Sequence, residues 1–99
     1  MKKSYYVLYL VPRRPDFAQT MTDEERGIMM QHIGYWTNLM NQGMVVVFGP
    51  VMDPHETYGI GIIAVDNEEQ LQEFMKNDPA ASINKYEFFP MRAVLPAVK

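Results

Sequence analysis

The order of predicted strands and helices along the 99 residues is βαββαβ, and this order predicts an α+β sandwich. Four runs of β-branched and aromatic residues indicate strands. Two segments with apolar residues at helical spacing, each preceded by capping residues, indicate helices. We therefore expect a single domain over residues 1–99 with a ferredoxin-like fold, in which two helices cover one face of a four-stranded antiparallel sheet.

The first strand and the first helix have clear boundaries. The strand is predicted over Tyr5–Val11, a run of β-branched and aromatic residues, and residues 12–21 are expected to form a loop. The helix is predicted to start at Thr22, because Thr22 and Glu25 have the spacing of a capping box. It is expected to stop at Gly43, a residue type that commonly follows the last turn of a helix.

Two further strands follow this helix. One is predicted over Met44–Met52, which is rich in valine. Pro50 has no N–H group to donate, so this strand must lie at an edge of the sheet or carry a bulge. Residues 53–57 form the predicted turn, and the next strand covers Tyr58–Val65.

The second helix and the last strand complete the pattern. The polar residues 66–69 predict the N-terminus of the helix, because they can cap its free N–H groups and complement its dipole. Pro79 disfavours the helical conformation at Asp78, so the helix should end there. The last strand is predicted over Tyr86–Leu95.

Both faces of the predicted sheet are apolar. The strands at Tyr5–Val11 and 44–48 carry apolar residues at odd and even positions alike. Two helices cover only one face of such a sheet, and an exposed apolar face of that size is unusual in a monomer. We therefore expect a homodimer in which a second copy covers the other face.

Composition argues against several classes of function. The net charge is −3 and the lysines and arginines are scattered, which argues against a nucleic-acid ligand. The chain has no cysteine, so disulfides, thiolate nucleophiles and cysteine-bound zinc are excluded. No apolar stretch approaches the roughly 20 residues of a membrane span, and no signal segment is recognisable. We expect a cytoplasmic protein that does not contact membranes.

His32 interrupts the apolar face of the first predicted helix. At about 100° per residue, its neighbours on that face are Ile28, Tyr35, Trp36 and Leu39, so the imidazole should point inward. A buried imidazole without a hydrogen bond costs roughly 1–3 kcal/mol. Either the core supplies its partner or a pocket uses the side chain.

Residues near this histidine are candidates to line such a pocket. Tyr35 and Trp36 are placed to contact a flat substrate, although aromatic pairs at this spacing also form ordinary core packing. Small residues in the neighbouring strands can leave a concavity beside the helix, namely Gly49, Pro50, Gly59 and Gly61. The alternative interpretation of these glycines is a local twist or bulge of the strand.

Two other clusters contain residue types that bind ligands. Asp53, His55 and Glu56 are metal-ligand types, but no fourth ligand is evident and the segment lies in a predicted turn, so we predict no metal site. Arg13-Arg14 and Arg92 have the chemistry to hold a carboxylate, and we interpret them as solvated charges.

The order and spacing of several motifs resemble the YCII-related family over nearly the whole chain. They are His32 on an apolar helix, then Gly43, Gly49-Pro50, Gly59 and Asp78-Pro79-Ala80. The resemblance implies a ferredoxin-like subunit of a dimeric α/β barrel, with an active site in which His32 and Asp78 face a cleft. Relatives in the broader barrel superfamily include cofactor-independent muconolactone isomerases and dehydrochlorinases that act on small ring compounds.

Three hypotheses follow for function. In the first, a small enzyme without metal or cofactor uses His32 as general acid or base, oriented by Asp78, in the elimination or isomerisation of a small acid, cyclic or open-chain. In the second, the chain is a non-catalytic dimeric module that binds a small molecule or a partner, with His32 as a core residue and Asp78 as the cap of a turn. A haem- or quinol-handling barrel is the third, and His32 is its only inward ligand.

Overall fold

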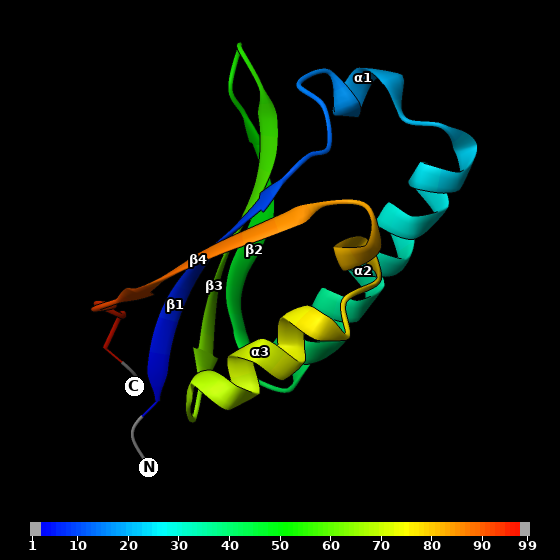
Figure 1. Cartoon of the computed structure of the whole chain (residues 1–99). Coiled ribbons are helices and arrows are strands. Elements are labelled where there is room, and N and C mark those ends of the chain that lie inside the picture. The colour runs from blue at the N-terminus through cyan, green and yellow to red at the C-terminus, as the bar shows by residue number, and fades with distance from the viewer. Residues whose placement is uncertain (1–2, 98–99) are drawn as a thin grey trace.

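A computed structural model describes residues 3–97, so the first two and last two residues of the predicted domain lie outside the described part. The elements in chain order are β1 (Ser4–Val11), α1 (Phe17–Thr20), α2 (Asp23–Asn41), β2 (Val45–Met52), β3 (Thr57–Val65), α3 (Glu68–Lys76), the 3-10 helix η1 (Pro79–Ser82) and β4 (Lys85–Met91). The strand order is β2-β3-β1-β4 and every neighbouring pair is antiparallel. The helices α2 and α3 lie on one side of the sheet (Figure 1). This is the predicted ferredoxin-like fold.

Local signals set both ends of α2, as predicted. The Thr22 hydroxyl accepts a hydrogen bond from the backbone N–H of Glu25, and the Glu25 carboxylate accepts one from the backbone N–H of Thr22. Both halves of the capping box are therefore present. Beyond the last turn, Gly43 has a φ of +86°, a conformation that costs glycine little.

The core lies between the inner face of the sheet and the helices α2 and α3. Along β1, the side chains of Tyr6, Leu8 and Leu10 are buried and alternate with partly exposed ones. This alternation directs every second side chain of the strand toward the helices. The fully buried side chains of largest volume are Leu8, Ile63, Leu71 and Val65.

Three local details differ from the predictions. The segment 12–21 contains the short helix α1, because the Phe17 side chain is buried and anchors it. A 3-10 helix, η1, follows α3 where only a helix end was expected. The last strand ends at Met91 and not at Leu95, because Met91 pairs with Tyr5 near the start of its only neighbour, β1.

The strand that contains Pro50 lies at an edge of the sheet, as predicted. Strand β2 is an edge strand, which accommodates Pro50, and its register against β3 shifts between Val45 and Val47.

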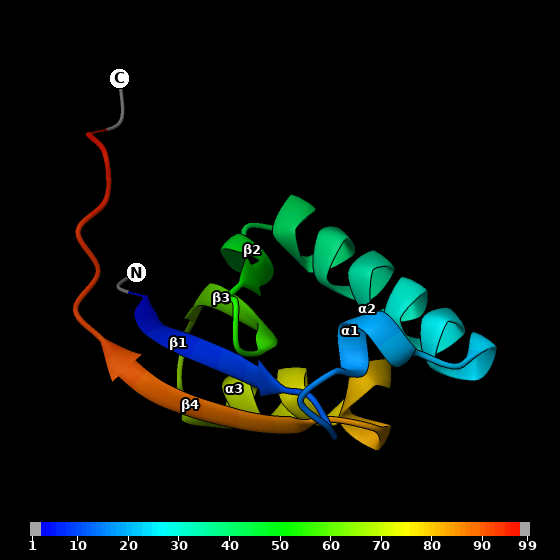
Figure 2. The same cartoon turned by 90° about the horizontal axis from the view of Figure 1, so that it is seen from above.

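Seen from above, the segment after β4 runs away from the rest of the fold (Figure 2). Within residues 3–97, no helix combines the length and the apolar character needed to cross a membrane.

The face of the sheet away from the helices is apolar. The Tyr9 ring lies between two aromatic neighbours, with its centroid 5.9 Å from that of Tyr58 and 6.2 Å from that of Phe89. The side chains of Val47 and Phe89 are 56% and 53% exposed. We call this surface the outer face, and it comprises Val7, Tyr9, Val47, Tyr58, Phe89 and Met91.

Candidate active site

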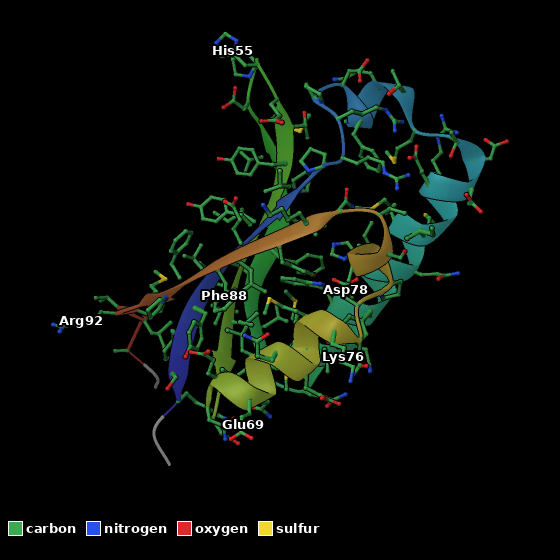
Figure 3. All side chains as sticks on the ribbon, in the orientation of Figure 1. His55, Glu69, Lys76, Asp78, Phe88 and Arg92 are labelled. Carbon is green, nitrogen blue, oxygen red and sulfur yellow. The ribbon has the colours of Figure 1, made fainter. Side chains whose placement is uncertain are left out.

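The fold brings His32 and Asp78 together in the interior. Helix α2 places His32 on its buried side, and Asp78 lies between α3 and η1. The His32 Nδ1 atom is 2.8 Å from Asp78 Oδ2 and 3.0 Å from Oδ1. Only 8% of His32 and 3% of Asp78 are exposed. Figure 3 shows Asp78 between the sheet and the helices.

Asp78 reaches this position through the local structure around Pro79. It is the N-cap of η1, where Pro79 occupies the first turn, and its Oδ1 atom accepts a hydrogen bond from the backbone N–H of Ala80 at 2.9 Å. This bond satisfies a free donor of the helix end. The carboxylate therefore caps a turn and binds His32 at the same time.

Two further side chains donate to the same carboxylate. The Trp36 Nε1–H group lies 2.6 Å from Asp78 Oδ2, and the Tyr86 hydroxyl also donates to Oδ2. Trp36 Nε1 is in addition 3.2 Å from the Tyr86 hydroxyl oxygen. Asp78 thus accepts bonds from three side chains and one backbone amide, a set that suits an ionised carboxylate, which only accepts.

The electrostatics of the cluster keep Asp78 charged and Tyr86 neutral. Burial alone would raise the pKa of Asp78, but the hydrogen bonds from His32 and Tyr86 outweigh it and leave that pKa below its ordinary value. Burial and the charge of Asp78 both raise the pKa of the Tyr86 hydroxyl. At neutral pH, the Tyr86 hydroxyl is therefore protonated and donates a hydrogen bond to the anionic Asp78 carboxylate.

This arrangement selects one tautomer of His32. Because Asp78 accepts, the neutral form of the ring carries its proton on Nδ1, which leaves the lone pair on Nε2. Both hydrogen bonds of the His32 ring within residues 3–97 involve Nδ1. The residue also lines a cavity, so Nε2 is the nitrogen left to interact with a bound molecule.

The cavity has a volume of about 230 Å³. It lies between α2 and the sheet, and α1 and the β2–β3 hairpin supply further walls. Its lining is mainly apolar. The polar or hydroxyl-bearing residues of the lining are His32, Thr57, Tyr58, Asn84 and Tyr86. An apolar cavity with a few polar groups is the usual form of a small-molecule site.

Four of the five predicted substrate-binding residues line this cavity, namely Trp36, Gly49, Pro50 and Gly59. Tyr35 does not, and its prediction as a pocket residue is wrong. Its hydroxyl donates to the backbone carbonyl of Phe74 at 2.8 Å and its ring packs on the Phe74 ring, so it connects α2 to α3. Asp78 is also absent from the lining and lies behind His32.

The glycines of β2 and β3 have different roles. A Cβ atom on Gly61 would lie 2.2 Å from Cζ3 of Trp36, so Gly61 is the residue that admits the indole ring, which explains it better than a twist or bulge. A Cβ on Gly59 would lie 3.2 Å from Cβ of Leu10. At Gly49, a Cβ would meet no atom within 4 Å, so packing does not require glycine there.

Sequence reasoning missed Tyr86 and Asn84. Tyr86 was recognised only as the start of a strand, although strand alternation with Phe88 would have pointed it inward. Asn84 donates from Nδ2 to the sulfur of Met29 at 3.5 Å, while its Oδ1 is the one buried side-chain polar atom in residues 3–97 without a hydrogen-bond partner. No sequence pattern indicates that pairing.

The residues considered for metal or carboxylate binding do not line the cavity. His55 is at the tip of the β2–β3 hairpin and Arg92 is at the end of β4, both distant from Asp78 (Figure 3). Arg13 and Arg14 bond to the carboxylate of Glu25. No group of three metal-ligating side chains occurs in the described part of the chain.

Comparison with known protein families produced a match. A sequence model of the YCII-related domain matches residues 5–94, a range that includes every helix of the fold and both His32 and Asp78. No curated protein and no solved structure matches the chain.

Proposed function

The chain belongs to the YCII-related domain family, and from that premise we propose that it is a small acid–base enzyme in which Nε2 of His32 is the general base. One observation carries the proposal. A buried imidazole lines an apolar cavity with one nitrogen held by a carboxylate and the other left to the cavity. The family match names no reaction, so the reaction class rests on these residues.

The proposed step is a proton transfer. Nε2 takes a proton from a carbon or oxygen atom of the substrate, and the imidazolium that results is stabilised by Asp78, whose Oδ2 atom is 2.8 Å from Nδ1. The proton then returns at another position in an isomerisation. In an elimination, the electron pair of the broken C–H bond forms a double bond as the leaving group departs. Such catalysis contributes about 10²- to 10⁴-fold to a rate.

Trp36 and Tyr86 support this step as positioning residues. Both donate to the Asp78 oxygen that lies closer to His32. They thereby hold the carboxylate in place and lower its basicity, so the proton stays on Nδ1 of His32. The substrate is small, because the cavity of about 230 Å³ accommodates a compound of one ring or two.

Solvent-deuterium exchange tests the proposal. Small cyclic hydroxyketones, which are uncharged and carry both a hydroxyl donor and a C–H bond next to a carbonyl, are incubated with the protein in D₂O, and deuterium at the carbon next to the carbonyl is measured by NMR. We expect the wild type to exchange at least about 100-fold faster than His32→Gln. Met30→Gln, a change at an exposed position of α2, is the matched control and should behave as the wild type. Equal exchange rates for wild type and His32→Gln would contradict the assignment of His32 as the general base.

A non-catalytic binding module is the second candidate. The four donors on Asp78 favour it, because such a network stabilises the core whether or not His32 does chemistry. In that case a compound that binds in the cavity should show no exchange with either protein, and His32→Gln should retain its binding.

We also propose that a second copy of the chain covers the outer face. The helices lie on the other side of the sheet (Figure 1), and the exposed side chains of Val47 and Phe89 belong to the outer face. Sheet-to-sheet packing of two copies would remove this apolar surface from water and form the dimeric barrel that the family resemblance implies.

A further inference from the structure

We propose that the ligand of this cavity is uncharged and enters with hydrogen-bond donors directed at His32 and Asn84. The inference rests on the proposed function, because it names the substrate class of the same cavity. It replaces the small acid that was expected from the sequence with a neutral cyclic alcohol, phenol or amide.

The charges around the cavity disfavour an anionic ligand. Within residues 3–97, no lysine or arginine lines it. Arg13 and Arg14 adjoin the wall residue Pro12, but their guanidinium groups lie 2.8–3.1 Å from the carboxylate oxygens of Glu25. Asp78 places a negative charge directly behind His32. A carboxylate in this cavity would lose its hydration shell without gaining a counter-charge.

Two residues of the cavity lining, His32 and Asn84, each carry an acceptor atom that receives no hydrogen bond from residues 3–97. His32 Nε2 accepts in the tautomer that Asp78 selects. Asn84 Oδ1 is buried and receives no hydrogen bond, while one of the two N–H groups of its Nδ2 donates to the sulfur of Met29, one helical turn before His32. The Tyr86 hydroxyl is committed to Asp78. The unmatched oxygen of Asn84 is thus an independent indication that the ligand brings a donor.

Donor and acceptor types then decide between ligand classes. An ionised carboxylate only accepts hydrogen bonds, so it would face acceptors at both His32 and Asn84. An alcohol, phenol or amide supplies the missing donor. The Thr57 hydroxyl rotates to donate or accept and does not discriminate. The remaining walls, which include Leu8, Leu10 and Phe17, suit the apolar body of a ring compound.

Benzamide and benzoate provide a matched pair of probes, because they share size and shape and differ in charge and donors. Calorimetric titration of the full-length wild type at pH 8 should show benzamide binding at least tenfold more tightly than benzoate. Equal or tighter binding of benzoate would overturn the inference. Failure of both compounds to bind up to their solubility limits would overturn it as well.

Variants separate the charge argument from the donor argument. Ile33 lines the cavity and is 52% exposed, so Ile33→Arg adds a cation at the rim with little effect on packing. It should strengthen benzoate binding at least fivefold and leave benzamide within twofold, whereas Ile33→Gln should change neither. Asn84→Leu should weaken benzamide at least fivefold and spare benzoate. An unchanged benzamide affinity in Asn84→Leu would overturn the pairing with Asn84.

The same samples distinguish this inference from the proposed function. If benzamide is preferred while wild type and His32→Gln exchange protons at equal rates, the ligand class stands and the catalytic role fails. If exchange depends on His32 while benzoate is preferred, the catalytic role stands and the ligand class fails.

Discussion

The Asp78 carboxylate is where the largest number of polar contacts meet in this site. It is 3% exposed and accepts bonds from His32, Trp36, Tyr86 and the backbone of Ala80. A buried donor that loses its acceptor costs about 1–3 kcal/mol, so these contacts depend on one another. The same network that orients His32 therefore also holds α2, η1 and β4 together.

Tyr86→Phe should weaken this network without creating a cavity. The change removes one donor to Asp78, so we expect a loss of about 1–2 kcal/mol in the free energy of unfolding, measured in urea. The pKa of Asp78 should rise toward its ordinary value, because one of the hydrogen bonds that lowers it is gone. Carbon-13 NMR titration of Asp78 checks this. Tyr9→Phe on the outer face is the control, because Tyr9 does not line the cavity, and an unchanged Asp78 pKa in Tyr86→Phe would contradict the assigned contact.

Gly61→Ala should displace the Trp36 ring. The new Cβ would lie 2.2 Å from Cζ3 of the indole, so we expect a loss of about 1–3 kcal/mol or more in stability. Trp36 is the single tryptophan, so its fluorescence emission should also shift. Gly49→Ala is the matched control on the neighbouring strand, where the Cβ meets nothing within 4 Å and the change should stay within about 1 kcal/mol. Similar losses in both variants would argue against the close approach at Gly61.

The N-terminus of α2 is tied to the segment that precedes it. Glu25 completes the capping box with Thr22 and also accepts hydrogen bonds from Arg13 and Arg14. The segment 12–21 contains α1 and forms part of the cavity wall through Phe17. The carboxylate of Glu25 therefore connects the segment 12–21, which forms part of the cavity wall, to α2, the helix that carries His32.

Glu25 should make stability depend on pH in the acid range. The hydrogen bond from Arg14, followed by that from the Thr22 backbone, holds the pKa of Glu25 well below its ordinary value of 4.5. A depressed pKa in the folded state gives stability that is present above pH 4.5 and is lost as the pH falls toward the folded-state pKa. Thermal melts should show a lower Tm for Glu25→Gln at pH 7 and a shallower decline in acid. The exposed Glu24→Gln is the control, and parallel declines for Glu25→Gln and wild type would contradict the prediction.

The sheet as a whole has one face covered by helices and one face that is apolar and open. The aromatic side chains Tyr9, Tyr58 and Phe89 form one cluster on the outer face. Because an apolar surface of this kind favours association, the isolated subunit is an incomplete unit in our proposal. The cavity lies on the opposite side of the sheet, between it and α2.

Sedimentation measurements should therefore find a dimer. Phe89→Asp places a charge in the aromatic cluster of the outer face, where it would be buried without a partner in the proposed dimer, and should shift the protein to monomer. Met30→Asp is the matched control, because Met30 is a 71% exposed apolar residue on α2, away from the outer face. A monomeric wild type, or a Phe89→Asp variant that remains dimeric, would contradict the proposed packing.

Element boundaries were accessible from the sequence wherever a local rule operates. The capping box at Thr22, the left-handed Gly43 and the edge position of Pro50 all depend on a residue and its near neighbours. The errors arose where distant contacts decide. Burial of Phe17 makes a helix in a predicted loop, and pairing with β1 ends β4 at Met91.

For the site, the sequence alone identified an inward His32 and named Asp78 only through a family resemblance. Periodicity sufficed for the histidine, because a helix repeats its faces every few residues. It could not pair His32 with Asp78, place Tyr86 and Trp36 on the same carboxylate, or show that Gly61 makes room for an indole ring. Those relations join segments far apart in the chain, and they come into existence only when the sheet and its helices pack against each other.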